Sequence, residues 1–532
     1  MQKRLLLRVK NLLIPMLLLT LLIVVISYLK PFLIIDETRY IGVAWEMFNS
    51  GNYLVPTLNG VPYDHKPPLL FWLINLDWHL FGLNTYTLRF IPLLFGIGIV
   101  FLNYKIYKLL WKDDKNGAKI VAWVTISMLL FSFYTTLFMF DIMLSFWVLL
   151  AMYGGLKIIK DGKLWSYFIF AFAIWFGILA KSPVILAHLL PLYLFANFWS
   201  AKEPGKSFYI GALVALLIGV ALALTWMIPA AKMGGEAFAR GIFWEQYAGR
   251  AVDAFAHKRP FWWYLPWVPL ILFPWLLNSN FYIGLKEITK SRFKDEGVRF
   301  LFVWIVGTFI IFSLISGKQL HYIVPEFSAF ALLITRAISL NKKSFYHARV
   351  YGALLIIVGI GFIVAPWFIK GYIRVFLDSK AFIVSGIVLG LYGVFLFIKK
   401  FKSKESFVKV VAISSILIIV SIHYIAHIYL HKQDLTKFSQ AISKLEQKGI
   451  KVAHYGKYHN QYQYFGRLKK PLVILWSKKS IEMFIKNNPN GAIITYKKRD
   501  IKYNKDAVIA TTKFRTQNAL LVKAKMWKEL NK

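Results

Sequence analysis

The stretch DETRYIGVAWEMFNSGNYLVPTLNGVPYDHKPPLL, residues 36–70, follows a long apolar run near the amino terminus. It opens with two acids, Asp36 and Glu37, and closes on His65 and Lys66. Charged side chains are costly beside the hydrocarbon core of a bilayer, so those that lie there usually have a function. The stretch therefore predicts a membrane protein with a polar site next to its first span.

A first amphipathic helix is predicted to begin near Asp36 and to end at Ser50-Gly51-Asn52. Asp36 has two interpretations, a plain helix cap or a functional carboxylate at the bilayer boundary. The apolar side chains of the helix recur with helical spacing, and we expect this face to lie on the membrane surface. They are Ile41, Ala44, Trp45 and Phe48.

A second interfacial helix is predicted in HKPPLLFWLINLDWHLFG, residues 65–82. Pro67 and Pro68 suit the first turn of a helix, so Lys66 stands directly before the helix amino terminus. The helix dipole and the ammonium both favour an anion at that point. Lys66 is therefore a candidate phosphate ligand, with contact to lipid phosphate as the alternative.

The composition indicates a polytopic helical membrane protein. Hydrophobic residues make up 58% of the 532 residues, and the mean hydropathy is +0.54. A span needs roughly 20 apolar residues, and the chain offers about thirteen such segments. The first is too long for the core of a signal peptide, so we expect a retained helix. The expected spans lie near residues 11–31, 89–109, 119–134, 142–158, 164–180, 183–199, 208–230, 262–280, 298–315, 322–339, 350–368, 380–398 and 409–428.

The formal net charge of +40 does not by itself indicate nucleic-acid binding. The Lys and Arg residues stand in short loops between apolar segments, where positive charge fixes orientation and meets anionic lipid. No nucleic-acid motif accompanies them. The basic loops occupy alternate gaps, and the positive-inside rule makes that side cytoplasmic. The chain has no cysteine, which excludes disulfides.

The opposite loops hold both acids and cations, and they predict a site on the extracytoplasmic face. The cations would hold a phosphate and the carboxylates would remain for chemistry, so an anionic headgroup on a lipid tail fits. No Gly-rich nucleotide fingerprint is present, so no nucleotide cofactor is expected. The residues are Asp36, Glu37, His65, Lys66, Asp141, Lys181, Glu245, His257, Arg259, Lys318, His321 and Tyr322.

Residues 432–532 differ in pattern from the membrane-embedded residues 1–431. Short β-rich runs alternate with helix-like segments and predict a small α/β domain, which the odd number of spans places outside the cell. The domain has no phosphate-binding loop and no catalytic cluster, so we expect a supporting or partner-binding role. The runs are KVAHYG, PLVILW, GAIITYK, AVIATTKF and ALLVKAK.

Several motifs together resemble those of the aminoarabinose transferases. This group belongs to the GT-C membrane glycosyltransferases, alongside the protein mannosyltransferases. The resemblance covers most of the chain, and its first-loop motif is specific for the fold and class rather than for one sugar. The motifs are DETRY and HKPPL in the first outer loop, FDIMLSFW (140–147), GILAKSPV (177–184), HKRPFWWYLP (257–266) and SGKQLHYIVP (316–325).

The resemblance implies an activity. Members take a sugar from a polyprenyl phosphate such as undecaprenyl phosphate. The bacterial enzymes place aminoarabinose on a lipid A phosphate at the inner membrane, which blunts antimicrobial peptides. The resemblance implies catalytic roles for Asp36 and Asp141. Binding of the carrier phosphate falls to a set of outer-face residues, namely Lys66, Arg259, Tyr322, Lys181 and Lys318.

The sequence departs from the family's pattern at two positions. His65 stands where these transferases often have a Glu that holds a metal together with an outer-loop histidine, matched here by His257. His65 and His257 could hold zinc, although two neutral imidazoles make a different site. Ser182 stands where glycine is usual. The sugar therefore stays open between aminoarabinose, galacturonic acid, mannose and a hexosamine.

Other functions remain open at this point. A transporter or flippase of an anionic polyprenyl-linked lipid would explain the cations, but it predicts a site near mid-bilayer. A protein O-mannosyltransferase-like enzyme is an alternative within the class, and a sensing module built on the tail is a third. The expected partners are a polyprenyl phosphate-linked sugar, lipid A or another glycolipid acceptor, and membrane lipids.

Overall fold

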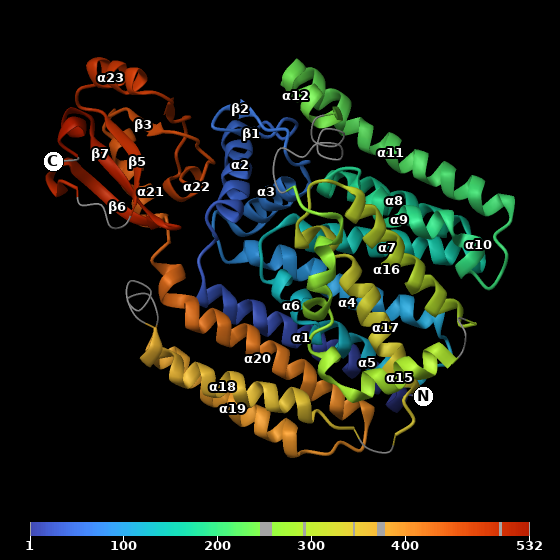
Figure 1. Cartoon of the computed structure of the whole chain (residues 1–532). Helices are drawn as coiled ribbons and strands as arrows, with labels where there is room; N and C mark the ends of the chain where they lie inside the picture. Colours follow the sequence, from blue (N-terminus) through green and yellow to red (C-terminus); the bar gives the residue numbers. More distant parts are fainter. Residues whose placement is uncertain are drawn as a thin grey trace. The chain divides into compact units, whose positions relative to one another are not determined.

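The computed structural model describes residues 2–244, 258–290, 294–343, 346–369, 378–498 and 503–530 (Figure 1). The chain divides into two structural units. We call residues 1–26, 65–69 and 89–425 the membrane body, and residues 27–64, 70–88 and 426–532 the loop–tail unit. Most of the first outer loop thus groups with the tail, whereas the sequence predicts a division between residues 431 and 432.

Long apolar helices make up most of the membrane body, as predicted for a polytopic membrane protein. In the described ranges, nine helices are long and apolar enough to cross a membrane. Two further apolar helices, α5 (Lys115–Ser127) and α6 (Leu129–Thr135), meet at a bend of 64° and form either a broken tenth span or a re-entrant loop. The nine are α1 (Gln2–Leu29), α4 (Phe90–Leu110), α7 (Phe140–Asp161), α8 (Leu164–Lys181), α11 (Lys206–Gly234), α16 (Glu296–Leu314), α18 (Arg349–Phe368), α19 (Ser379–Ile398) and α20 (Lys404–His431).

The nine helices and the bent pair correspond to ten of the about thirteen predicted spans, and the other three predicted segments form short or broken helices in the described ranges. The first two segments contain proline, which lacks a backbone N–H, with Pro191 inside α9 and Pro266 inside η3. Apolar composition does not reveal such breaks. The elements are α9 (Val184–Leu194) with α10 (Ala196–Trp199); η3 (Phe261–Trp267) with α14 (Val268–Ile271) and η4 (Trp275–Leu277); and η5 (Leu320–Ile323) with α17 (Glu326–Leu340).

A polar cluster around Arg336 of α17 ties four helices together at one end of the body. The guanidinium donates to Asp114 at 3.1 Å and to Asp295 at 2.7 Å. Asp114 caps α5 and Asp295 caps α16, each by accepting a backbone N–H. Tyr107 of α4 donates its hydroxyl to Asp114 at 2.7 Å. Burial alone would raise the pKa of Asp114, but these hydrogen bonds and the charge of Arg336 lower it.

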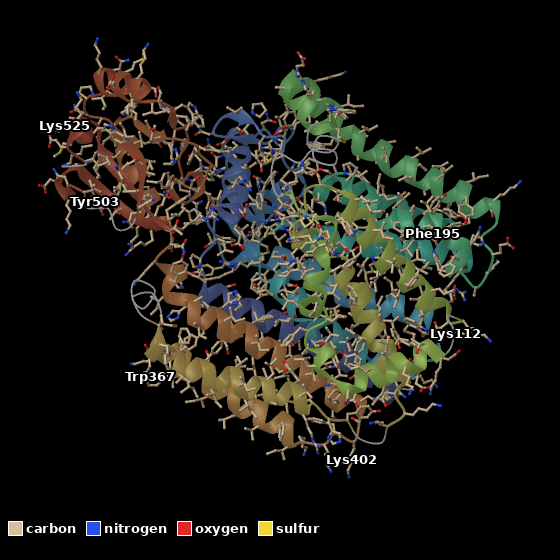
Figure 2. All side chains as sticks on the ribbon, viewed as in Figure 1. Lys112, Phe195, Trp367, Lys402, Tyr503 and Lys525 are labelled. Carbon is tan, nitrogen blue, oxygen red and sulfur yellow. The ribbon has the colours of Figure 1, made fainter. Side chains whose placement is uncertain are left out.

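Basic connections lie at this same end of the body. Lys160 near the end of α7 pairs with Glu296 at the start of α16 (3.0 Å), and Lys404 at the start of α20 donates to a carbonyl near the end of α17. Figure 2 shows Lys112 and Lys402, from the connections before α5 and before α20, at the margin where the N-terminus lies. The opposite ends of α7 and α16 and the start of α17 therefore lie at the other end of the body.

The loop–tail unit contains a five-stranded sheet of order β4-β3-β5-β7-β6. β3 pairs in parallel with β4 and β5, and β7 pairs antiparallel with β5 and β6. Phe438 and Ile442 of α21 belong to the apolar core that covers Ile494 and Leu521 of the sheet. The predicted α/β tail is confirmed. Its elements are α21 (Thr436–Gln447), β3 (Val452–Tyr455), α22 (Gln463–Gly466), β4 (Val473–Leu475), α23 (Lys478–Asn487), β5 (Ala492–Lys498), β6 (Val508–Phe514) and β7 (Gln517–Lys523).

The tail holds the first outer loop through α2 (Asp36–Ser50) and α3 (Leu69–Phe81). The indole of Trp45 donates to the carbonyl of Leu468 at 2.8 Å, and the ring of Trp78 stacks on Tyr464 with centroids 4.8 Å apart. Ile41, Ala44 and Trp45 are buried inside the unit. The expectation that this face of α2 lies on the membrane was wrong, because the tail and α3 cover it.

Glu46 connects α2 to the tail and to the short hairpin of β1 (Thr57–Leu58) and β2 (Val61–Pro62). Its carboxylate accepts hydrogen bonds from the hydroxyl of Thr57 (2.6 Å) and from the backbone N–H groups of Asn59 (2.7 Å) and Gly60 (3.0 Å). It also accepts from the side-chain amide of Asn460 (2.6 Å). One carboxylate thereby joins three segments that are distant in sequence.

We expect Arg336→Ala to lower the free energy of unfolding by about 2–4 kcal/mol, because it leaves two partly buried carboxylates without their cation. Thermal unfolding in detergent measures the change. Arg240→Ala is the control, since Arg240 pairs with Glu236 on an exposed surface and should change little. An Arg336→Ala protein as stable as the control would contradict the role of the cluster.

The same cluster predicts a pH dependence. The folded-state pKa of Asp114 lies below its usual value of 3.8, so its contribution is present above that value and is lost as the pH falls through the folded pKa. The stability difference between wild type and Arg336→Ala should therefore be constant near neutral pH and shrink below about pH 4. Unfolding midpoints measured from pH 3 to 7 test this.

Glu46→Gln should loosen the attachment of the loop to the tail, because an amide nitrogen would then face N–H and O–H donors. We expect faster cleavage of the hairpin and α2 in limited proteolysis of the full-length protein. Glu482→Gln is the matched control, since Glu482 is exposed on α23. Equal cleavage rates for the two variants would argue against the role of Glu46.

Candidate functional site

An ion pair between Asp141 and Lys181 forms the centre of the site in the membrane body. Asp141 lies in the first turn of α7, and Lys181 is the last residue of α8. These helices are joined by a short connection, which brings the start of one beside the end of the other. Only 3% of the Asp141 side chain and 10% of the Lys181 side chain are exposed. The ammonium compensates the cost of burying the carboxylate.

Lys66 and His321 also act electrostatically on the carboxylate of Asp141. Lys66 directly precedes the two prolines before α3, and its ammonium lies 5.7 Å from the ring centroid of Phe140. His321 lies in η5, between α16 and α17. Three basic side chains that are distant in sequence therefore surround one buried acid.

The ring of Tyr322 contacts the same group of residues. The ammonium of Lys181 lies 5.2 Å from its centroid, a distance at which a cation is attracted to an aromatic face. The ring of His321 packs edge-on against it at 4.8 Å. Tyr322 thus borders the cationic region, as a residue of a phosphate pocket would.

Ser182 ends α8 in a backbone conformation that side chains rarely adopt. Its φ is 73° and its ψ is −174°, a region populated almost entirely by glycine. Its N–H donates to the carbonyl of Ile178 at 2.8 Å and closes the helix directly after Lys181. Glycine would adopt this conformation without strain.

Lys318 holds the segment that carries Arg259. Its ammonium donates to the carbonyls of Arg259 (3.1 Å) and Ile315 (2.5 Å), and burial lowers the pKa of Lys318. The N–H of Arg259 donates to the carbonyl of Ser316 at 3.2 Å, and the Arg259 side chain is exposed. These contacts favour a supporting role for Lys318, while its assignment as a phosphate ligand stays a prediction.

The two acids that open the first loop have different environments in the loop–tail unit. Asp36 is the first residue of α2 after the cap position of Ile35; its carboxylate pairs with Arg39 at 2.7 Å and is 59% exposed. Glu37 is buried and pairs with Lys30 at 3.1 Å. Glu37 is therefore a structural tie, and Asp36 remains the accessible carboxylate.

The predicted zinc ligands are only partly described. His65 is exposed, and His257 lies outside the described residues. Within the described ranges no group of three or more His, Asp or Glu side chains could hold a metal ion. The zinc site stays a prediction.

Sequence reasoning missed two functions. It grouped His321 with the outer-face residues but gave it no role, although His321 acts on Asp141. It passed over Glu46, which lies on the polar face of an amphipathic helix and looks like a solvated acid. One local feature of the sequence indicated a role for Glu46. The Asn59-Gly60 pair is typical of a tight turn, whose backbone N–H groups need an acceptor.

The chain is similar to known proteins over most of its length. A family model described as dolichyl-phosphate-mannose-protein mannosyltransferase matches residues 65–226. An undecaprenyl phosphate-alpha-4-amino-4-deoxy-L-arabinose arabinosyl transferase of Edwardsiella ictaluri is 29% identical over 354 residues, which are 63% of this chain and 62% of that relative. A second such transferase, of Sodalis glossinidius, is 29% identical over 67% of both chains. The alignments thus span about two thirds of these relatives or slightly less.

A solved structure shares the fold. ArnT from Cupriavidus metallidurans, bound to undecaprenyl phosphate, has a TM-score of 0.75 at 14% sequence identity and covers 97% of this chain and 98% of its own. The chain therefore has the fold of that membrane protein. In sequence, the chain is similar to the undecaprenyl phosphate-aminoarabinose arabinosyl transferases, and part of it matches the mannosyltransferase family model.

Ser182→Gly should raise the free energy of unfolding by about 1 kcal/mol, since relief of a strain of roughly 1–3 kcal/mol exceeds the entropy that glycine adds to the unfolded chain. Thermal unfolding in detergent measures the gain. Ser385→Gly is the control with opposite sign, because Ser385 lies inside α19, where glycine is unfavourable. A destabilised Ser182→Gly protein would contradict the strain.

Proposed function

We propose that this protein transfers 4-amino-4-deoxy-L-arabinose from an undecaprenyl phosphate carrier to lipid A. The observation that carries the proposal is the gathering of Lys66, Lys181 and His321 around the buried Asp141. Such a cluster of basic side chains suits the phosphate of a lipid-borne donor. The names of the curated relatives and the undecaprenyl phosphate bound to the structure of the same fold support the choice of sugar and carrier.

The proposed reaction exchanges one bond at the anomeric carbon. An acceptor oxygen bonds to this carbon while its bond to the carrier phosphate oxygen breaks, and the electron pair leaves with the phosphate. Lys66 and Lys181 stabilise the charge that develops there. The exposed guanidinium of Arg259 and the hydroxyl of Tyr322 complete the proposed phosphate ligands.

The two aspartates take different parts in the proposed mechanism. Asp141 is paired with Lys181, so it orients that ammonium toward the phosphate rather than acting as a free base. Asp36 is accessible. If the acceptor is a hydroxyl, Asp36 takes its proton. If the acceptor is a phosphate of lipid A, no base is needed, and Asp36 positions the sugar.

The proposal puts the site on the periplasmic side of the bacterial inner membrane. Basic connections gather at one end of the membrane body, around the Arg336 cluster. The site residues stand at the opposite ends of α7, α8 and α16. The positive-inside rule assigns the basic end to the cytoplasm, which supports this orientation.

We expect the purified full-length protein, reconstituted in vesicles with aminoarabinose-linked undecaprenyl phosphate and lipid A, to add a fixed mass to lipid A. Asp141→Asn and Lys66→Met should lower the rate about 100-fold or more, because each removes part of the phosphate-stabilising charge. Asp161→Asn, at the other end of α7, is the control and should keep the rate. Mass spectrometry of lipid A measures the rate of transfer by wild type and by the three variants.

Three outcomes would count against the proposal. Unchanged transfer by the Asp36→Asn, Asp141→Asn double variant would remove both aspartates from the mechanism. Movement of the carrier lipid between leaflets without release of its sugar would favour a flippase. An unmodified lipid A together with a newly glycosylated protein would point to the mannosyltransferase-like alternative.

A further inference from the structure

A second buried polar pair lies in the membrane body, between His188 of α9 and Glu326, the first residue of α17. The imidazole Nδ1 and the carboxylate Oε1 are 2.7 Å apart, and both side chains are 0% exposed. The indole of Trp304 from α16 donates to the same oxygen at 3.4 Å. Three helices meet at this hydrogen bond.

The pair is only half satisfied. Within the described part of the chain, His188 Nε2 and Glu326 Oε2 are buried and have no hydrogen-bond partner. The ring of Phe312, an apolar neighbour, lies 4.8 Å from the imidazole. A half-satisfied polar pair costs free energy, and apolar side chains of similar volume would often be at least as stable. A contribution to stability therefore does not explain why these two polar residues are buried here. A role in fixing the positions of the helices that carry them does explain it.

Each partner closely follows a residue of the site in sequence. His188 lies in α9, which begins directly after Lys181, Ser182 and Pro183. Glu326 begins the helix that directly follows Tyr322 and η5. The pair thus connects the two segments whose side chains meet where the Lys181 ammonium lies 5.2 Å from the Tyr322 ring.

Phe312 of α16 supplies a packing link between the pair and the site. Its ring contacts the imidazole of His188 at 4.8 Å and the ring of Tyr322 at 6.5 Å. A change in the spacing of α9 and α17 would therefore shift Tyr322, both through the backbone of η5 and through the ring of Phe312. Close packing transmits such shifts.

We propose that His188 and Glu326 are a positioning pair for the phosphate site. Their hydrogen bond holds the start of α17 against α9, which keeps Tyr322 beside Lys181 and keeps the Lys181 ammonium between that ring and Asp141. The inference rests on the proposed function and deepens it, because it assigns donor-phosphate affinity to two residues that do not touch the phosphate.

The test measures binding of undecaprenyl phosphate to the full-length protein in detergent. Glu326→Leu removes the hydrogen bond and keeps the volume, and we expect it to raise the Kd about tenfold or more, because small displacements of binding groups are costly. Glu326→Gln keeps an acceptor oxygen for the imidazole N–H and should stay within about threefold of wild type. In the transfer assay, Glu326→Leu should raise KM for the donor more than it lowers kcat.

A matched control separates position from general stability. Tyr351→Phe removes another buried hydrogen bond, between Tyr351 of α18 and Ser414 of α20 at 2.9 Å. We expect it to lower the unfolding midpoint and to leave the Kd for undecaprenyl phosphate unchanged. The exchanged pair, His188→Glu with Glu326→His, restores a hydrogen bond in the reverse direction and should recover part of the affinity lost in Glu326→Leu.

The outcomes distinguish this inference from the proposed function. If wild type binds undecaprenyl phosphate and a folded Glu326→Leu binds it equally well, the positioning pair is refuted and the proposed function stands. If Glu326→Leu does not fold, the exchanged pair decides. A folded exchanged pair that does not bind undecaprenyl phosphate refutes the positioning pair, and a folded exchanged pair that binds it supports the positioning pair. If wild type itself does not bind, the proposed function fails and the inference falls with it.

Discussion

The ion pair between Asp141 and Lys181 is the contact on which the rest of the site depends. Burying either charge alone at the edge of an apolar helix bundle would cost free energy, and the ion pair offsets this cost for both side chains. The short connection between α7 and α8 lets them meet across one helical hairpin. Lys66, His321 and Tyr322 lie near this pair and come from other connections, so the pair is the centre of a cluster of basic side chains.

The helices of the membrane body separate two kinds of polar cluster by the length of a span. At one end, Arg336 pairs with Asp114 and Asp295, and these two carboxylates also cap α5 and α16. At the other end stand Asp141 and Lys181 with their neighbours. The first cluster is nearly saturated with hydrogen bonds and contributes stability. The second keeps cations beside one acid, which is the arrangement that a phosphate ligand would complete.

The loop–tail unit shows how an exposed carboxylate is held in place. The tail covers the apolar face of α2 and anchors it through Trp45 and Glu46, so the helix that begins with Asp36 is fixed along its length. Glu37 is buried against Lys30, while Asp36 stays accessible. A supporting role for the tail, predicted from its lack of a catalytic motif, agrees with these contacts.

The sequence by itself determined that the molecule is a polytopic helical membrane protein with basic loops in alternate gaps and an α/β tail, because apolar run length, charge distribution and strand patterns are local properties. The tertiary structure alone decided which charges meet. It pairs Asp141 with Lys181, turns Lys318 toward backbone carbonyls, buries the face of α2 and joins His188 to Glu326. It also breaks three apolar segments at positions where composition looks continuous. Such outcomes depend on which distant side chains are brought within a few ångströms of one another, and no local pattern encodes that.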